Sequence, residues 1–315
     1  MSQTNLSQLQ PWQNPLGWLY AFWKFSRPHT IIGTSLSVLA LYLIAVAFSN
    51  SSSLLPIPHS LIIAWVACLC GNVYIVGLNQ LEDIEIDKIN KPHLPLASGE
   101  FSITTGRIIV AITGILALVL AAIGSQYLLG MVAISLFIGT SYSLPPIRLK
   151  RFPFWAAVCI FSVRGAIVNL GLFLHFHWLL AENTSIPLAV WVLTLFILVF
   201  TFAIAIFKDV PDRSGDRQYN IMTFALQFGQ LAVFNLSLWV ISVCYGGMIL
   251  LGFLRVQEIN SVFLVTSHVI ALAVMWWRSR GVDLEDKVAI ATFYQFIWKL
   301  FFFEYLMFPV ACLLA

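Results

Sequence analysis

Long apolar stretches restrict the fold of this chain more than any other feature. A helix that crosses a bilayer needs about 20 mostly apolar residues, and nine such stretches follow one another along the 315 residues. They cover residues 29–48, 59–81, 104–124, 127–144, 154–175, 187–207, 231–253, 260–277 and 293–314. Soluble proteins carry about 25% charged residues, whereas this chain carries 10% and is 60% hydrophobic. The sequence therefore predicts an all-α, polytopic membrane protein with nine transmembrane helices around a central cavity.

The lysines and arginines predict how the chain is oriented. Fifteen of the 17 lie in the N-terminal arm, in alternate loops or at the adjoining helix ends, and the exceptions are Arg164 and Arg255. Positively charged loops mark the cytoplasmic side of a membrane. We therefore expect a cytoplasmic or stromal N-terminus, and a C-terminus on the opposite side after an odd number of spans. The net charge of +3 is too small to indicate a nucleic-acid partner.

No linker or shift in composition divides the chain. We expect residues 1–315 to form one membrane-embedded domain, with residues 1–20 as a flexible arm. That arm holds no charged residue, so neither a basic signal peptide nor an Arg-rich transit peptide is visible. A thylakoid or a plasma membrane could house such a protein. The five cysteines match no zinc-binding pattern and are expected to be small buried hydrophobic residues.

Two short segments hold seven of the chain's fourteen acidic residues. They share one spacing, Asn79-x-x-x-Asp83-x-x-x-Asp87 and Lys208-x-x-x-Asp212-x-x-x-Asp216. If both are helical, a four-residue step turns the chain by about 400°, so the polar groups of each segment share one face. Both segments follow an even-numbered span, which places them on the same side of the membrane.

Several carboxylates repel one another unless a cation lies between them. Sites rich in oxygen suit Mg²⁺, which commonly takes one or two carboxylates and completes its shell with water and phosphate oxygens. We therefore predict that the five oxygen ligands Asn79, Asp83, Asp87, Asp212 and Asp216 hold Mg²⁺ and clamp a diphosphate, with the four aspartates as catalytic residues. The alternative is two solvated acidic loops, which the repeated spacing on one side disfavours.

Basic residues in the same loops could complete a diphosphate site. They are Arg27, Lys91, Arg148, Lys150 and Lys208. Each of them could equally be a residue that only sets the topology. His29, which follows Arg27 closely, could touch the site, although a role at the start of a helix is the favoured interpretation.

Arg164 lies about ten residues into the fifth apolar stretch, roughly 15 Å along a helix. An ionisable group at that depth is costly and is by default a candidate functional residue. The functional hypothesis is that Arg164 binds an anion, such as the carboxylate of a small substrate. The alternative is an internal ion pair, for which Glu304 in the last stretch is a candidate partner.

The paired aspartate segments resemble the signatures of the UbiA superfamily of intramembrane prenyltransferases, and the resemblance extends over nearly the whole chain. The second motif of that superfamily often has a tyrosine four residues before the lysine, where this chain has Ile204. That departure affects any role of a tyrosine hydroxyl, but not the metal-binding role of the aspartates.

Further segments resemble the homogentisate phytyltransferase branch of the superfamily, which is found in cyanobacteria and plastids. They include residues 25–34, 77–81, 90–100, 163–165 and 206–212. The resemblance implies Mg²⁺-dependent transfer of a phytyl group from phytyl diphosphate to homogentisate, with loss of the carboxylate. The implied product is 2-methyl-6-phytyl-benzoquinol, in tocopherol (vitamin E) biosynthesis.

Alternative functions remain open from the sequence. The acceptor could instead be that of a chlorophyll synthase or of a 4-hydroxybenzoate or naphthoate prenyltransferase. A secondary transporter is the alternative of a different class. Transporters usually place their acidic residues near the bilayer midplane within inverted repeats, whereas these aspartates gather at one face. Besides the two substrates, the expected partner is membrane lipid.

Overall fold

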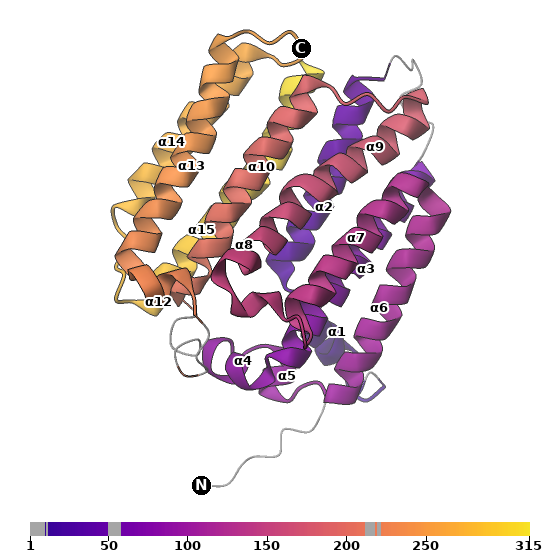
Figure 1. Cartoon of the computed structure of the whole chain (residues 1–315), viewed down its shortest axis with the longest axis vertical. Helices are drawn as coiled ribbons and strands as arrows, with labels where there is room; N and C mark the ends of the chain where they lie inside the picture. The colour runs from indigo at the N-terminus through magenta and orange to yellow at the C-terminus, as the bar shows by residue number, and fades with distance from the viewer. Residues whose placement is uncertain (1–9, 11, 50–57, 212–217, 219–221) are drawn as a thin grey trace, which may run out of the picture.

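The computed structural model describes residues 10, 12–49, 58–211, 218 and 222–315, and the secondary structure of these residues is helical. The main helices run side by side along the length of the molecule (Figure 1). The first half of the chain forms α1 (Pro15–Phe25), α2 (Pro28–Ala47), α3 (Pro58–Glu82), α4 (Ile84–Asn90), α5 (Pro95–Ser98), α6 (Ile103–Gly124), α7 (Gln126–Ser143) and a short 3₁₀ turn, η1 (Leu149–Arg151). The second half forms α8 (Pro153–Phe161), a π-helical segment η2 (Ser162–Ile167), α9 (Val168–Ala181), α10 (Leu188–Phe207), α12 (Phe224–Phe228), α13 (Gln230–Phe253), α14 (Ser261–Ser279) and α15 (Lys287–Leu313).

Eight helices in the described part of the chain are long and apolar enough to cross a membrane. Each coincides with one of the expected stretches, and their ends differ by about six residues or fewer. The remaining stretch, 127–144, is α7, whose 18 residues include a polar Gln126 at the start and polar residues over its last turn. The polytopic membrane fold is confirmed, whereas the count of nine spans is not.

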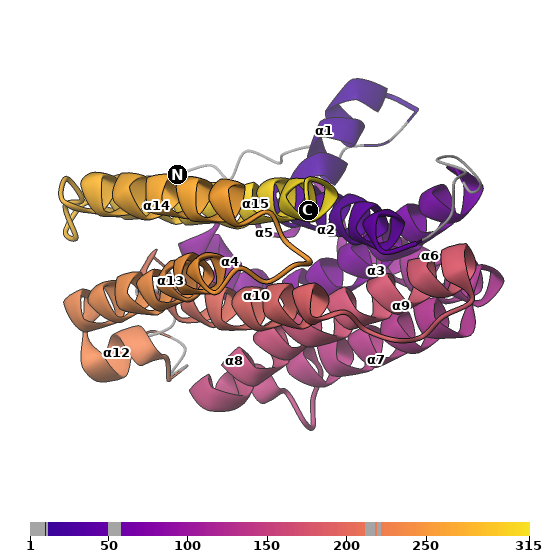
Figure 2. The same cartoon turned by 90° about the horizontal axis from the view of Figure 1, so that it is seen from above.

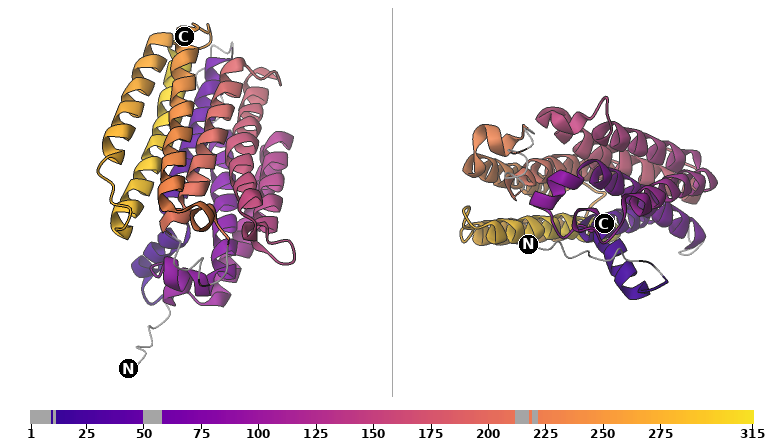
Figure 3. Two further views of the ribbon diagram at one scale, coloured as in Figure 1. Left: turned by 60° about the vertical axis from the view of Figure 1, so that its left-hand side comes forward. Right: turned by 90° about the horizontal axis from the view of Figure 1, so that it is seen from below.

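Helix α10 occupies the centre of the bundle. Its sequence is apolar all round, which predicts a helix buried on every side, and 67% of its span is buried, the highest share among the eight. It contacts α8, α9, α13 and α15. Figures 2 and 3 show α13 to α15 on one side of it and α6 and α7 on the other.

The connecting helices lie at one end of the bundle. Helices α1, α4, α5 and α12 gather there, while the C-terminal residue lies at the other end (Figure 1). Residues 15–20, which were expected in a flexible arm, belong to α1. The reason is local: Pro15 is preset for the first helical position, and the Asn14 side chain accepts a hydrogen bond from the Gly17 N–H (2.9 Å).

The long segment Pro153–Ala181 contains a wide turn that its apolar pattern did not reveal. The π-helical residues Ser162–Ile167 separate α8 from α9, and such turns are frequent at functional sites. Gly165 allows α10 to approach, because a Cβ at this position would lie 2.4 Å from the Cα of Leu198. Asn169 donates a hydrogen bond to the carbonyl of Gly165 (2.7 Å). Arg164 projects from this turn.

We expect Gly165→Ala to destabilise the bundle, because the added methyl group meets the backbone of α10 and one of the two helices must move. Overpacking of this kind costs about 1–3 kcal/mol. The thermal unfolding temperature of the purified protein in detergent measures the effect. Gly246→Ala is the matched control, since its Cβ would meet no atom within 4 Å, and it should unfold at or above the wild-type temperature. Equal unfolding temperatures for the two variants would contradict the prediction.

Candidate functional site

A cavity of about 1130 Å³ extends from the end of the bundle that carries α4 into its interior. It is lined from α2, α3, α4, α7, α8, η2, α10 and α15. Pockets for small molecules usually enclose roughly 300–1,000 Å³. This cavity is therefore large enough for more than one ligand.

The first acidic segment lies at the cavity wall. The expected continuous helix is interrupted, since α3 ends at Glu82 and Asp83 occupies the N-cap position of α4. One hydrogen bond still spans the break, because the Asp83 N–H donates to the Gln80 carbonyl (3.3 Å), while the Asp87 N–H donates to the Asp83 carbonyl (2.7 Å) and opens α4. Asn79, Asp83 and Asp87 all line the cavity, as the spacing predicted.

Asp83 is the centre of the charged end of the cavity. Its carboxylate contacts Lys150 Nζ at 2.7 Å and Arg148 Nη2 at 3.4 Å. The Asn79 Nδ2 donates a further hydrogen bond to it (2.9 Å). Burial lowers the pKa of Lys150, and the neighbouring Asp83 carboxylate opposes that shift. One carboxylate therefore holds two cations at this wall.

Arg148 occupies a different place from the one expected for a diphosphate ligand. It is not among the residues that line the cavity. Its guanidinium instead contacts Asp83 and donates to the Glu82 carbonyl (3.3 Å). A cation near a helix C-terminus is stabilised by the helix dipole. Arg148 therefore caps the end of α3 and contacts Asp83 from outside the cavity.

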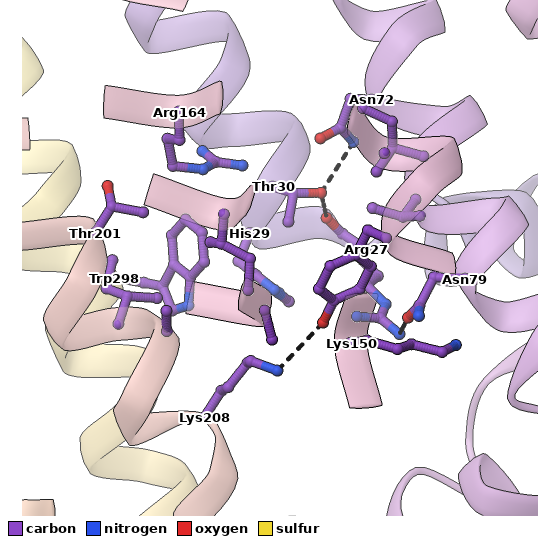
Figure 4. Close-up of a pocket in the computed structure, with 18 of the residues that line it drawn as sticks. Arg27, His29, Thr30, Asn72, Asn79, Lys150, Arg164, Thr201, Lys208 and Trp298 are labelled. Atoms are coloured by element: carbon purple, nitrogen blue, oxygen red, sulfur yellow. Dashed lines mark hydrogen bonds between the residues drawn. The ribbon is translucent and has the colours of Figure 1, made fainter. Parts of the chain in front are cut away.

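Two other predicted cations line the cavity beside the acidic segment. Arg27, at the start of α2, donates from Nη2 to the Oδ1 of Asn79 (3.2 Å). Lys91 lies 4.0 Å from a carboxylate oxygen of Asp87. Figure 4 shows Arg27, Asn79 and Lys150 close together. These cations and the first acidic segment therefore lie together at one end of the cavity.

The second segment reaches the same cavity. Lys208, at the C-cap of α10, donates to the Tyr142 hydroxyl (3.5 Å) and lies 3.4 Å from the Asp209 carboxylate. Lys208 and Asp209 both line the cavity. Asp212 and Asp216 lie outside the described residues. The start of the second segment therefore shares a cavity with the first.

Arg164 reaches the interior of the cavity, away from the charged end. Its guanidinium lies 5.1 Å from the ring centre of Trp298 and 5.6 Å from that of Phe301, both within cation–π range. Glu304, the candidate partner, instead contacts His268 Nε2 at 3.0 Å, and both of these side chains are fully buried. Within the described part of the chain Arg164 forms no ion pair. The anion-binding hypothesis is therefore favoured over an internal ion pair.

Several polar residues of the cavity were missed in the sequence. Asn72 donates to Thr30 Oγ1 (2.9 Å) on the wall opposite Arg164. Asn72 could have been found, since it precedes Asn79 by seven residues and two helical turns return to the same face. Trp298 and Thr201 also line the cavity. Both carry a buried polar atom without a hydrogen-bond partner, and nothing in the sequence pairs them with the motifs.

The residues present fit a hard divalent cation. Asn79, Asp83 and Asp87 line the cavity and carry amide and carboxylate oxygens, the donor type that Mg²⁺ prefers. No cluster of three or more His, Cys, Asp or Glu occurs among the described residues, which exclude Asp212 and Asp216. The three described members of the five predicted ligands are thus chemically suitable.

Comparisons with known proteins agree with this geometry. The model of the UbiA prenyltransferase family matches residues 35–300. A homogentisate phytyltransferase of Synechocystis sp. is 56% identical over 93% of this chain and 96% of its own length. Homogentisate phytyltransferase 1 of Arabidopsis thaliana is 42% identical over 92% of this chain and 75% of its own. The solved structure of a UbiA homolog from Archaeoglobus fulgidus bound to GPP and Mg²⁺ has a TM-score of 0.62 at 16% identity, covering 94% of this chain and all of that one.

Tyr305 supports the turn that carries Arg164, because its hydroxyl donates to Asn169 Oδ1 (2.8 Å) while Asn169 holds the Gly165 carbonyl. We expect Tyr305→Phe to leave the buried amide oxygen of Asn169 without its donor, at a cost of about 1–3 kcal/mol. The thermal unfolding temperature should fall accordingly. Tyr42→Phe is the control, because the described contact of Tyr42 is a ring contact with Phe176. A Tyr305→Phe protein as stable as this control would contradict the role given to the hydroxyl.

Proposed function

Because this chain belongs to the UbiA prenyltransferase family, we propose that it transfers a phytyl group from phytyl diphosphate to homogentisate. The carboxylate of homogentisate leaves as CO₂, and the product is 2-methyl-6-phytyl-benzoquinol. The proposal treats residues 1–315 as one membrane-embedded prenyltransferase domain. Support for these substrates comes from the relatives in Synechocystis sp. and Arabidopsis thaliana, which are named homogentisate phytyltransferases.

One observation carries the proposal. A single cavity joins a charged end, suited to a diphosphate, to an interior that contains Arg164, suited to a carboxylate. The two substrates carry these two anions. Since both sites face one enclosed volume, both substrates can meet inside it.

The chain's own cations would bind the diphosphate. Arg27, Lys91, Lys150 and Lys208 line the charged end and offer positive charge to a leaving group. Arg148 would act indirectly, by holding Asp83 in place. Asn79, Asp83 and Asp87, together with Asp212 and Asp216, would hold Mg²⁺, which supplies neutralising charge to the leaving oxygens when bound.

The interior would protect the reactive prenyl group from water. Breaking the allylic C–O bond leaves a cation that water would quench, so an apolar enclosure favours transfer to the acceptor. Apolar residues of α7 and α8 line this part of the cavity, among them Leu136, Ile138, Ala156 and Ile160. They also offer a path for the long tail toward membrane lipid. The indole of Trp298, which also lines the cavity, could stabilise positive charge.

Arg164 would select the acceptor. A guanidinium binds a carboxylate by two parallel hydrogen bonds, and the rings of Trp298 and Phe301 restrict where that guanidinium can lie. The acceptor ring would then be directed toward the charged end, where the prenyl cation forms.

The charged end would face the cytoplasm or stroma. This orientation follows from the lysines and arginines, fifteen of which belong to that side in the sequence. It also puts the water-soluble homogentisate on the side from which it can enter. Either a thylakoid or a plasma membrane satisfies the proposal.

The deciding experiment is product analysis with the purified protein, Mg²⁺, homogentisate and two diphosphates of different saturation, phytyl and geranylgeranyl. We expect 2-methyl-6-phytyl-benzoquinol as the main product, formed with stoichiometric release of diphosphate. Preferred use of the geranylgeranyl donor would change the donor assignment. Preferred prenylation of chlorophyllide, 4-hydroxybenzoate or a naphthoate would change the acceptor.

We expect Asp83→Ala and Asp212→Ala to abolish turnover while the fold is retained. Charge stabilisation at such a site is worth several kcal/mol, which corresponds to a loss of about 10³-fold or more. Diphosphate release measures turnover, and size-exclusion elution in detergent reports folding. Glu85→Ala is the control, since Glu85 belongs to the same segment but is exposed and pairs with Lys88. Near-normal activity of the Asp83→Ala protein would rule out this mechanism.

We expect Arg164→Ala to raise the KM for homogentisate by about 10- to 100-fold, because a charged hydrogen bond is worth about 1.5–3 kcal/mol. The KM for the prenyl diphosphate should stay unchanged. Methylhydroquinone, which lacks the carboxylate, should be used equally by the wild type and the variant. Arg107→Ala, on the exposed face of α6, is the control. An unchanged KM for homogentisate would refute the assignment of Arg164.

A further inference from the structure

His29 lies in the part of the cavity where the acceptor ring would bind. Its imidazole packs against Trp298, with ring centres 4.8 Å apart, and the guanidinium of Arg164 lies 5.1 Å from the same indole ring. Figure 4 shows His29 between Trp298 and Arg27, with Arg164 above it and Lys208 below it. A ligand whose carboxylate reaches Arg164 therefore presents its ring near His29.

The imidazole is available for chemistry. His29 is half-buried and lines the cavity, and no described residue forms a hydrogen bond with its ring. Its ring nitrogens are not fully buried either, so they are open to the cavity.

The carboxylates of the cavity in the described part of the chain lie at the charged end and contact cations, while the other imidazole there, His93, is exposed between α4 and α5. Asp83 contacts Lys150 at 2.7 Å, Asp209 contacts Lys208 at 3.4 Å, and Asp87 lies 4.0 Å from Lys91. A neutral imidazole carries one ring nitrogen that can accept a proton, and the imidazolium that results can donate it again. Among the described residues, His29 is thus the base placed beside Arg164.

The proposed reaction needs a proton to be moved. As the C–O bond of the diphosphate breaks, a C–C bond forms between the allylic carbon and a ring carbon ortho to a hydroxyl, and that ring carbon must then lose its proton. The C–CO₂ bond also breaks, its electron pair stays on the methylene carbon, and that carbon gains a proton to become the methyl group. The ring carbon loses one proton and the methylene carbon gains one. A single group that accepts the first proton and donates the second therefore balances the reaction and returns to its starting protonation state.

The geometry points to His29 as this proton carrier. It accepts the proton from the ring carbon that has received the prenyl group, and the imidazolium that results is the donor for the methylene carbon. This inference rests on the proposed function, because it assumes homogentisate as the acceptor. It gives His29 a catalytic role that is separate from carboxylate binding by Arg164 and from diphosphate binding at the charged end.

The test is a primary isotope effect with homogentisate deuterated at the ring carbon that is prenylated. In the wild type we expect labelled and unlabelled acceptor to react at similar rates. In His29→Gln we expect turnover to fall about 10²-fold or more, as for loss of a general base, and the remaining reaction to be clearly slower with the labelled acceptor. The ratio of diphosphate released to prenylated product should also rise. His29→Phe, which keeps a ring against Trp298, should behave in the same way.

The controls separate this inference from the proposed function. His59→Asn, at an exposed position at the start of α3, should match the wild type. Normal turnover by His29→Gln would overturn the inference alone. So would an equal loss of turnover with deuterated and undeuterated homogentisate, if the ratio of diphosphate released to prenylated product stayed unchanged. A wild-type protein that forms no product from homogentisate would overturn the proposed function, and the inference with it.

Discussion

The ion pair between Asp83 and Lys150 is the contact on which the rest of the site depends. A carboxylate and an ammonium 2.7 Å apart, at the mouth of an apolar bundle, neutralise each other where water is scarce, and loss of either one would leave the charge of the other uncompensated. The pair also joins the loop before α8 to the break between α3 and α4, which are far apart in the sequence. Arg148 and Asn79 complete the arrangement from two sides. Charge balance at one aspartate thus fixes the geometry of the charged end.

The interior obeys a different constraint, set by packing. Helix α10 is apolar on all sides and lies at the centre, and Arg164 reaches the interior from a place where its own backbone departs from the regular α-helix. That place is the π-helical turn at Ser162–Ile167. Gly165 permits the close approach to α10, and Asn169 with Tyr305 satisfies the carbonyl that the wide turn releases. The guanidinium of Arg164 then lies over the aromatic ring of Trp298, and no described carboxylate pairs with it.

These two constraints explain what the sequence could and could not predict. Apolar length predicted the eight long helices of the described residues, because apolar content can be read along the chain residue by residue. Regular spacing placed Asn79, Asp83 and Asp87 at one wall. Periodicity could not reveal the break at Asp83, the π turn around Arg164 or the indirect place of Arg148, because each depends on a partner from another helix. The contact between Trp298 of α15 and His29 of α2 could not be predicted either, because it also joins helices that are far apart in the sequence.

The separation of the two ends has a chemical consequence. Cations and carboxylates gather where a diphosphate would leave, while Arg164 and His29 lie in the apolar part. A cation released between them has the negative diphosphate on one side and an electron-rich ring on the other, with little water to compete. An acceptor held by its carboxylate cannot turn its ring away from that cation without giving up a charged hydrogen bond. In the proposed reaction, the guanidinium that would bind the acceptor would therefore also direct its ring toward the prenyl cation.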